Sequence, residues 1–410
     1  MPRVLLLLPT TTYRSADFLA AANKLGVDVT VATEETSAAE RLAGEALATI
    51  DFRDPERAAR LALDLAGRTP FDAVLGVDDE TEVAAAEIAR SLGLRHNSRL
   101  SAEAARHKPA MRAALRSAGV PVPRFAVFSA DQDPVAVALA VSYPCVLKPT
   151  FLAASRGVIR ADDPEELVAA WERIGAILRD PDVARRGRGY AREILVEDFI
   201  AGPEVALEGL LEAGALRVLA IFDKPDVLDG PFFEETIYVT PSRLPAGVQA
   251  DVASAAASAA RALGLTEGPI HVELRVNPSG IFVIEAAARS IGGLCSRTLR
   301  FGTGLSLEEL ILRHALGMPA EAARESASAG VMMIPIPRAG TLSRVEGLAE
   351  ASSVPGIVEA TITIRPGQKL VPLPEGWRYL GFLFSRADTP EEAERALREA
   401  HGKLRFEIED

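Results

Sequence analysis

Cysteine and lysine are both scarce in this 410-residue chain, and long apolar runs are missing. Two cysteines are too few for a disulfide framework. A formal net charge of −12 argues against a nucleic-acid partner, because phosphate binding needs a basic surface. No apolar run reaches the length of a membrane span, and residues 4–8 are too few for the core of a signal peptide. We therefore expect a cytoplasmic protein without nucleic-acid or membrane partners.

Both cysteines are expected in the core. Cys145 lies inside an apolar strand pattern, where it would serve as a small core residue. Cys295 follows Gly292 and Gly293, so it could line a site, although burial is the simpler expectation.

The N-terminal part of the chain alternates strand and helix patterns. Residues 3–8 and 27–31 have the apolar pattern of buried strands, and residues 16–25 have the period of a helix that ends at Gly26. This β-α-β order implies a parallel sheet, so we expect a small doubly wound α/β domain. No Gly-x-Gly-x-x-Gly follows the first strand, which argues against dinucleotide binding there.

The chain is long enough to predict two or three domains rather than one core. Lys108 and Pro109 open a new helix, and a polar stretch at residues 321–328 precedes a set of short strands. We place domain boundaries at these two points. The predicted domains are an N-terminal α/β domain at 1–107, a central domain at 108–320 with a small part at about 120–192 and a large part at about 193–320, and a C-terminal α+β domain at 321–410.

Residues 271–289 carry the strongest indication of function. Apolar and β-branched residues on both sides of a Pro278-Ser279-Gly280 loop predict two strands joined by a tight turn. Directly opposed residues of such a pair share one face of the sheet. The expected facing pairs are Glu273 with Glu285, His271 with Ala287, and Asn277 with Ile281.

The facing glutamates predict a metal site. Two carboxylates side by side repel each other unless a cation lies between them, and oxygen ligands suit Mg²⁺ that substrate phosphates also hold. The alternative is an exposed face with solvated charges. The small residues at 286–288 and at Gly292-Gly293 leave this face uncrowded, which favours the metal.

Cations lie near the same motifs. Arg289 continues the face that carries the two glutamates, where it could contact a phosphate or a carboxylate. Lys148 follows an apolar run, which disfavours a purely solvated role. The six lysines of the chain are Lys24, Lys108, Lys148, Lys224, Lys369 and Lys403.

These motifs resemble those of the ATP-grasp superfamily, and most of all those of the L-amino-acid ligases and related carboxylate–amine ligases. The resemblance covers roughly residues 70–410, with the specific motifs between 108 and 300. It implies an ATP-grasp fold with an N-terminal doubly wound α/β domain and a small β-rich C-terminal domain. The family's second strand usually carries Glu-x-Asn-x-Arg, whereas this chain has Ala287 instead of Asn. One metal ligand is therefore missing or replaced by water.

The resemblance also implies an ATP site. Lys148 would reach the α- and β-phosphates, and the loop at 150–158 would cover them as a lid. Only Gly157 remains of the several glycines usual in this loop, so we expect a stiffer lid. The implied ATP-binding residues are Lys108, Lys148, Ser155, Gly157, Glu197, Asp198, Phe199 and Ile200, with Glu204 on the ribose hydroxyls.

Metal, catalytic and substrate roles follow from the same resemblance. Glu273 and Glu285 would hold one or two Mg²⁺ ions, for which Mn²⁺ could substitute. The implied catalytic residues are Arg289, Glu235 and Lys224. The implied substrate-binding residues are Tyr238, His271, Gly292 and Gly293.

The implied function is an ATP-dependent carboxylate–amine ligase that joins amino acids through an acyl phosphate and releases ADP and phosphate. Its partners would be small molecules, and a homodimer stays open. The main alternative is a purine-biosynthesis or carboxylase-type ATP-grasp enzyme that activates formate or bicarbonate, because those enzymes use similar domains. A nucleotide-binding module without catalysis is a third interpretation, which Ala287 and the glycine-poor loop would fit.

Overall fold

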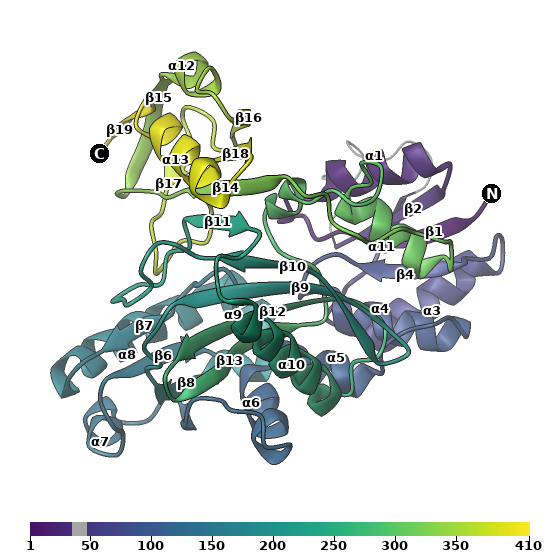
Figure 1. Ribbon diagram of the computed structural model, residues 1–410. Helices are drawn as coiled ribbons and strands as arrows, with labels where there is room; N and C mark the ends of the chain where they lie inside the picture. Colours follow the sequence, from purple (N-terminus) through teal and green to yellow (C-terminus); the bar gives the residue numbers. More distant parts are fainter. Residues whose placement is uncertain (35–46) are drawn as a thin grey trace.

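The computed structural model describes residues 1–34 and 47–410 (Figure 1). Its N-terminal part is a parallel sheet with strand order β3-β2-β1-β4, so the parallel sheet predicted from the β-α-β pattern is confirmed. The elements are β1 (Arg3–Leu7), α1 (Ser15–Leu25), β2 (Asp28–Thr33), β3 (Leu47–Thr49), α3 (Pro55–Ala66), β4 (Ala73–Gly76) and α4 (Glu82–Leu92).

Local sequence signals explain where these helices begin and end. The Asp54 side chain accepts a hydrogen bond from the Arg57 backbone N–H at the start of α3, which satisfies a free donor of the first turn. Gly26 and Gly93 end α1 and α4 in the left-handed conformation, which glycine adopts without steric penalty. The predicted helix end at Gly26 is thus confirmed.

A small antiparallel sheet with strand order β5-β8-β6-β7 lies at the lower left of Figure 1. Its apolar face packs against α8, with Leu147, Trp171 and Ile174 in one core cluster. The elements are β5 (Phe125–Ser129), α7 (Pro134–Ala138), β6 (Cys145–Pro149), β7 (Ile159–Ala161), α8 (Pro164–Arg179), α9 (Pro181–Gly187), the 3₁₀ helix η1 (Arg188–Arg192) and β8 (Glu193–Asp198).

The central sheet has strand order β13-β12-β9-β10-β11-β14-β18-β16. Its strands come from both sides of the predicted boundary at residue 320, so the C-terminal strands β14, β18 and β16 extend the sheet of the central part. The strands are β9 (Glu204–Glu212), β10 (Ala215–Asp223), β11 (Ile237–Thr240), β12 (Gly268–Asn277), β13 (Gly280–Ala287), β14 (Ser328–Ile334), β16 (Ile357–Ile362) and β18 (Gly381–Ala387).

Helices cover this sheet near β12 and β13, and a smaller sheet follows it in the C-terminal part. α10 packs against β13 and α6, and residues of these elements share one core cluster. The smaller sheet has strand order β17-β15-β19. The remaining elements are α5 (Arg99–Arg106), α6 (Lys108–Ser117), α10 (Ala246–Leu263), η2 (Cys295–Thr298), α11 (Leu307–Ala315), β15 (Gly340–Glu346), α12 (Leu348–Ser352), β17 (Lys369–Leu370), α13 (Pro390–His401) and β19 (Arg405–Glu409).

The hairpin of β12 and β13 differs from the predicted register at its turn. Asn277 pairs with Gly280, so the prediction that it faces Ile281 was wrong. An irregularity between Glu273 and Leu274 shifts the register by one residue. Beyond it, Glu273 faces Glu285, as predicted, and the predicted pairing of His271 with Ala287 is also present.

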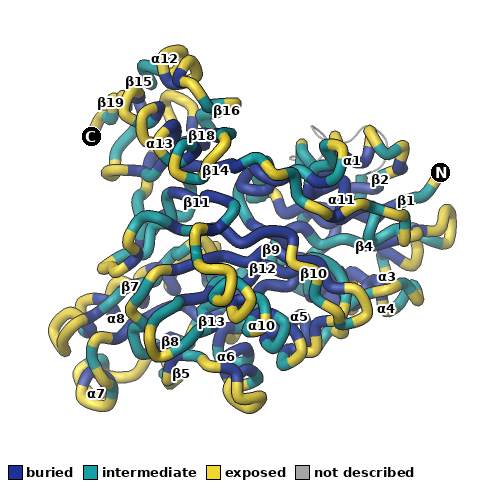
Figure 2. The backbone as a smooth tube through the Cα atoms, viewed as in Figure 1, coloured by how far each residue is buried: buried dark blue, intermediate teal, exposed yellow. Residues whose placement is uncertain are grey.

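One core cluster joins the N-terminal, central and C-terminal parts. It contains Leu6, Phe222, Phe301 and Phe382, each with 2% or less of its surface exposed. Figure 2 shows the central strands as the most deeply buried part of the molecule. Both cysteines are buried, as expected.

The helices within residues 1–34 and 47–410 include none that is both long enough and apolar enough to cross a membrane.

Phe222→Ala should destabilise the protein strongly, because it removes a fully buried ring from the shared core. We expect a loss of about 3–5 kcal/mol in the free energy of unfolding, measured by denaturant titration. Val227→Ala is the control, because Val227 is 81% exposed and its truncation should change stability by less than about 0.5 kcal/mol. Equal stability of the two variants would contradict a core shared by the three parts.

Candidate active site

A cavity of about 310 Å³ lies where the parts of the chain meet. The N-terminal domain contributes loops that follow β1 and β4, and the small antiparallel sheet contributes the loop after β6. The central sheet forms one wall, and residues before β18 complete the cavity. Most of the predicted site residues line it: Lys108, Lys148, Ser155, Glu197, Asp198, Phe199, Ile200, Glu204, Glu235, Tyr238, His271, Glu273, Glu285, Arg289, Gly292 and Gly293.

A buried ion network holds Lys148, the lysine predicted to reach the phosphates. Its ammonium pairs with Glu197, whose other oxygen accepts a 2.9 Å hydrogen bond from Arg112 Nε. Burial alone would raise the pKa of Glu197, but the charges of Arg112 and Lys148 lower it to about 2. The Glu197 side chain therefore fixes the direction of Lys148.

The loop after β6 keeps a glycine-like backbone with few glycines. Ala154 and Ser155 both have φ of 53°, in the left-handed region that non-glycine residues rarely adopt. Gly157, predicted to contact ATP, lies outside the cavity wall, and its N–H donates to the Pro374 carbonyl at 2.8 Å. The C-terminal part of the chain thus occupies this donor, and the ATP contact of Gly157 stays a prediction.

The same C-terminal segment contacts the lid loop at Arg156 and the neighbouring helix α8 at Arg173. Arg156 Nε donates to the Glu375 carbonyl at 2.8 Å. The Arg173 guanidinium on α8 forms a two-pronged pair with the Glu375 carboxylate, with Nη2 2.9 Å from Oε2. Trp377, two residues further on, lines the cavity. The lid is thus fastened to the C-terminal part beside the cavity.

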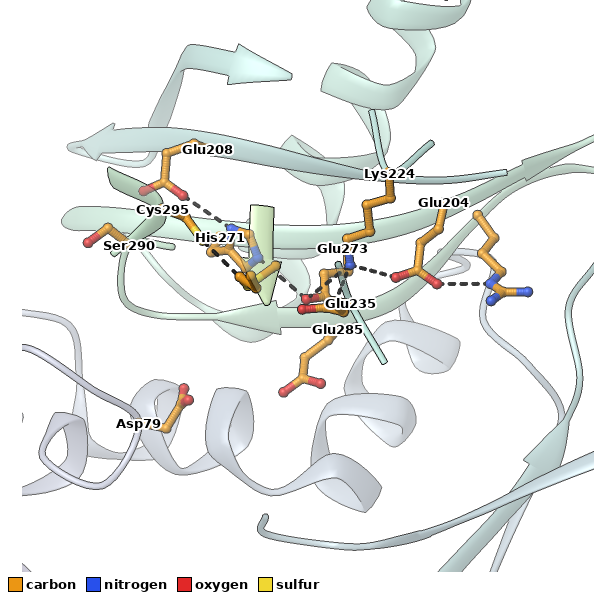
Figure 3. Close-up of polar contacts among 12 residues, drawn as sticks. Asp79, Glu204, Glu208, Lys224, Glu235, His271, Glu273, Glu285, Ser290 and Cys295 are labelled. Carbon is orange, nitrogen blue, oxygen red and sulfur yellow. Dashed lines mark hydrogen bonds and ion pairs between the residues drawn. The ribbon is translucent and has the colours of Figure 1, made fainter. Parts of the chain in front are cut away.

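Three glutamates converge at the centre of the cavity (Figure 3). Oxygens of Glu204, Glu235 and Glu273 lie within 4.8 Å of one another, close enough to hold a cation. The Lys224 ammonium lies among them, 2.7 Å from Glu204 Oε1 and 3.5 Å from Glu273 Oε1, and it also pairs with Glu235. Lys224 lies behind these carboxylates and is not among the residues that line the cavity, and its predicted catalytic role stays a prediction.

Burial and pairing set the charges of this cluster. Burial would lower the pKa of Lys224, but the charges of Glu204, Glu235 and Glu273 raise it well above its usual range. Burial would raise the pKa of Glu273, but Lys224 and a hydrogen bond from His271 hold it far below its usual range. Burial does raise the pKa of Glu235. Glu273 is therefore the firmly ionised member and Glu235 the one best suited to take a proton.

Glu204 has both oxygens occupied. Oε1 accepts from Lys224, and Oε2 accepts from Arg275 Nε at 2.9 Å. The predicted contact of Glu204 with ribose hydroxyls stays a prediction. The hydroxyls would have to bind the same two oxygens that Lys224 and Arg275 already contact. Arg275 was missed in the sequence, although it alternates with Glu273 and so had to share its face.

The second predicted metal ligand, Glu285, pairs with a different lysine. Lys108 Nζ lies 3.3 Å from Glu285 Oε1 and donates to the Leu152 carbonyl at 2.8 Å. Each of the two facing glutamates therefore has a lysine ammonium within 3.5 Å, although Lys224 is shared with Glu204 and Glu235. Lys108 thus links Glu285 on β13 to Leu152 in the loop after β6.

The Arg289 guanidinium faces the cavity and pairs with Asp79, whose Oδ2 is 2.8 Å from Nη2 and 3.0 Å from Nε. Burial would lower the pKa of Arg289, but the charge of Asp79 raises it above its usual range. Asp79 was missed in the sequence. The signal was present as the acidic run Asp78-Asp79-Glu80 directly after β4, at the carboxyl edge of the parallel sheet.

Aromatic side chains line the part of the cavity beside Glu235. Tyr238 lines it beside Glu235, and burial raises its pKa well above the usual range. Cys295 is buried and also lines the cavity, so both expectations for it hold. Tyr379 and Trp377 complete this wall and were missed, because they lie in an irregular segment without a motif.

His271 bridges two carboxylates rather than facing the cavity freely. Its Nδ1 lies 3.2 Å from Glu208 Oε2 and its Nε2 lies 3.5 Å from Glu273 Oε1. Burial would lower the pKa of His271, but hydrogen bonds to Glu208 and Glu273 raise it to about 9. Its substrate-binding role stays a prediction. Glu208 was missed, although a charge inside an apolar strand signals a buried partner.

Family models match three stretches of the chain. A model of the ATP-grasp domain matches residues 141–298, and a model of the ATP-grasp N-terminal domain matches residues 19–96. A model of the L-amino acid ligase C-terminal domain 2 matches residues 332–409. The fold class expected from the sequence is thereby confirmed.

Relatives and solved structures agree with these models. Alanine–anticapsin ligase of Bacillus subtilis is 28% identical over 263 residues, which are 60% of this chain and 54% of that protein. The chain spans about half the length of the curated relatives it matches. A crystal structure of L-amino acid ligase from Bacillus licheniformis superposes with a TM-score of 0.82 at 28% identity, over 100% of this chain and 99% of that chain.

A solved carboxyaminoimidazole ribonucleotide synthase from Aspergillus clavatus, in complex with ATP, gives a TM-score of 0.75 at 18% identity and covers 98% of this chain and 99% of that chain. At this identity the likeness shows a common fold alone.

Lys148→Ala should weaken ATP binding more than it harms stability. The substitution removes the buried ammonium from the cavity, while Arg112 still neutralises Glu197. We expect about tenfold weaker binding of a non-hydrolysable ATP analogue by calorimetric titration. Lys403→Ala is the control, because Lys403 is exposed and lies outside the cavity. Unchanged affinity in Lys148→Ala would assign Lys148 to a structural role only.

Proposed function

We propose that this chain, which belongs to the ATP-grasp superfamily, is an ATP-dependent ligase that joins the carboxylate of one amino acid to the amine of another. The observation that carries the proposal is the convergence of Lys148, Arg289 and the facing glutamates on one cavity. Cations on the phosphate side and acids on the amine side are what such a reaction needs.

The residues present fit a divalent metal. Glu273 and Glu285 face each other, and carboxylate oxygens are the ligands that Mg²⁺ prefers. We propose that these two glutamates hold one or two Mg²⁺ ions, with Mn²⁺ as a substitute, and that water takes the place of the ligand missing at Ala287. The ion would offset charge on the transferred phosphoryl group when it is bound.

The cations of the chain support the first half of the reaction. One oxygen of the substrate carboxylate attacks the γ-phosphorus of ATP, and the bond to the β,γ-bridging oxygen breaks to give an acyl phosphate and ADP. Lys148 would hold the phosphates that stay on ADP. Arg289 would stabilise charge on the acyl phosphate, and Asp79 holds its guanidinium in place for that task.

The acids support the second half. The amine attacks the carbonyl carbon, the C–N bond forms, phosphate leaves, and the amine gives up a proton. Glu235 is our candidate acceptor, because burial raises its pKa and Tyr238 lies beside it in the wall. The fastened lid would keep water from hydrolysing the acyl phosphate.

We also propose that each of the three predicted domains contributes a different part of the active site. Residues 1–107 would supply Asp79 and the loops that close the substrate side. Residues 108–320 would supply the lid loop, the predicted ATP-binding residues at 197–200, and the wall that carries Glu273 and Glu285. Residues 321–410 would extend the central sheet and fasten the lid through Glu375.

The alternative substrates, formate and bicarbonate, fit this cavity less well. Neither carries a cationic amine, and neither needs the acids around Lys224. The match of residues 332–409 to an L-amino acid ligase domain also favours the ligase. A module without catalysis would leave the paired glutamates, Lys148 and Arg289 without a purpose.

Glu285→Gln should abolish most turnover and keep the fold. A neutral amide relieves repulsion with Glu273 but binds Mg²⁺ poorly, so we expect about 100-fold lower kcat at low Mg²⁺. Phosphate release is the measurement, and circular dichroism checks the fold. The exposed Glu350→Gln is the control. Near-wild-type turnover of Glu285→Gln at low Mg²⁺ would show that the metal assignment is wrong.

Hydroxylamine should trap the activated acid as a hydroxamate. The trapping should need ATP, Mg²⁺ and one particular amino acid, because only an acyl phosphate makes the carboxylate reactive. Arg289→Met should abolish it, since a neutral side chain cannot offset the developing charge, whereas the exposed Arg405→Met should not. Hydroxamate formed with formate, or ATP hydrolysis driven by bicarbonate, without any effect of amino acids, would decide for the alternative.

A further inference from the structure

Glu208 is a buried carboxylate to which the proposed reaction assigns no role, and it lies on the strand next to the one that carries Glu273. Glu208 on β9 has no exposed surface, and its Oε1 has no hydrogen-bond partner among the described residues. Its other oxygen, Oε2, accepts from two donors at once. These are His271 Nδ1 at 3.2 Å and the Ile291 backbone N–H at 3.0 Å.

Each of the two donors leads to a different part of the cavity. His271 also contacts Glu273, the proposed metal ligand, because its Nε2 lies 3.5 Å from Glu273 Oε1. Ile291 lies immediately before Gly292 and Gly293, which line the substrate side. Figure 3 shows Glu208 and His271 joined by a dashed contact, with Glu273 beyond them.

Strand pairing explains why Glu208 is the group placed there. In the register of β9 and β12, Glu208 faces His271, Ala206 faces Glu273, and Glu204 faces Arg275. The metal ligand thus lies opposite a small residue and between two charged cross-strand pairs. Ala206 cannot orient Glu273, so its orientation comes from the neighbouring pairs and from Lys224.

We propose that Glu208 is a positioning residue whose single oxygen Oε2 sets both the metal ligand Glu273, through His271, and the substrate loop at 291–293, through the Ile291 N–H. The inference rests on the proposed function, because it assigns Glu273 to the metal. It links metal binding and substrate binding through one buried atom. Groups of this kind around metal sites change metal affinity by about 10- to 100-fold when they are removed.

The test measures Mn²⁺ binding in the presence of ADP by electron paramagnetic resonance, without turnover. Glu208→Ala should bind Mn²⁺ about tenfold more weakly. Glu208→Asp keeps the charge but is one methylene shorter, so it cannot reach both donors, and it should also bind more weakly. Glu309→Ala is the matched control, because Glu309 is 3% exposed and lies outside the cavity wall, and it should bind as wild type does.

Two further readouts separate positioning from general damage. Glu208→Ala combined with Glu273→Gln should bind Mn²⁺ no more weakly than Glu273→Gln alone, because Glu208 acts through Glu273. Amide exchange at residues 290–293, followed by mass spectrometry, should quicken in both Glu208 variants and stay unchanged in Glu309→Ala. If Glu208→Ala does not fold, the Mn²⁺ affinity and the amide exchange of Glu208→Asp are compared with those of the wild type instead.

Wild-type affinity and wild-type exchange in the folded Glu208→Asp variant would overturn the inference, as would full additivity in the double variant. Failure of the wild-type protein to bind Mn²⁺ with ADP is a different result, because it would overturn the metal assignment of the proposed function itself.

Discussion

The neutralisation of buried carboxylates on one face of the central sheet is the constraint on which the site depends. Glu204 and Glu208 on β9 are buried, and Glu273 on β12 is half-buried beside them. An unpaired charge there would be strongly destabilising, so each carboxylate has a cationic partner, and His271 and Arg275 supply two of them from the adjacent strand. Lys224 and His271 keep Glu273 ionised, and its carboxylate lines the cavity.

The remaining partners come from distant parts of the chain, which makes the site a product of the whole fold. Lys108 begins α6, Asp79 follows β4 of the N-terminal sheet, and Glu375 reaches the lid from the C-terminal part. One core cluster joins the N-terminal, central and C-terminal parts, and α6 packs on the central sheet in a second cluster. The ion pairs around the cavity are thus shared between the N-terminal, central and C-terminal parts.

Periodicity and turn residues predicted most of the elements and the facing of Glu273 and Glu285, because strand alternation fixes which side chains share a face. They failed where structure depends on contacts distant in sequence. The irregularity at Glu273, the capture of the Gly157 N–H by Pro374, and the position of Lys224 behind the acids all follow from tertiary packing. No local pattern carries that information.

The central claim is that two amino acids are joined at the cost of ATP. The most direct measurement incubates the protein with ATP, Mg²⁺ and pairs of amino acids, and follows phosphate release together with product mass. We expect phosphate release that depends on particular amino acids, with a product whose mass is the sum of the two minus one water. Phosphate release that needs only bicarbonate or formate, with no such product from any pair, would contradict the account.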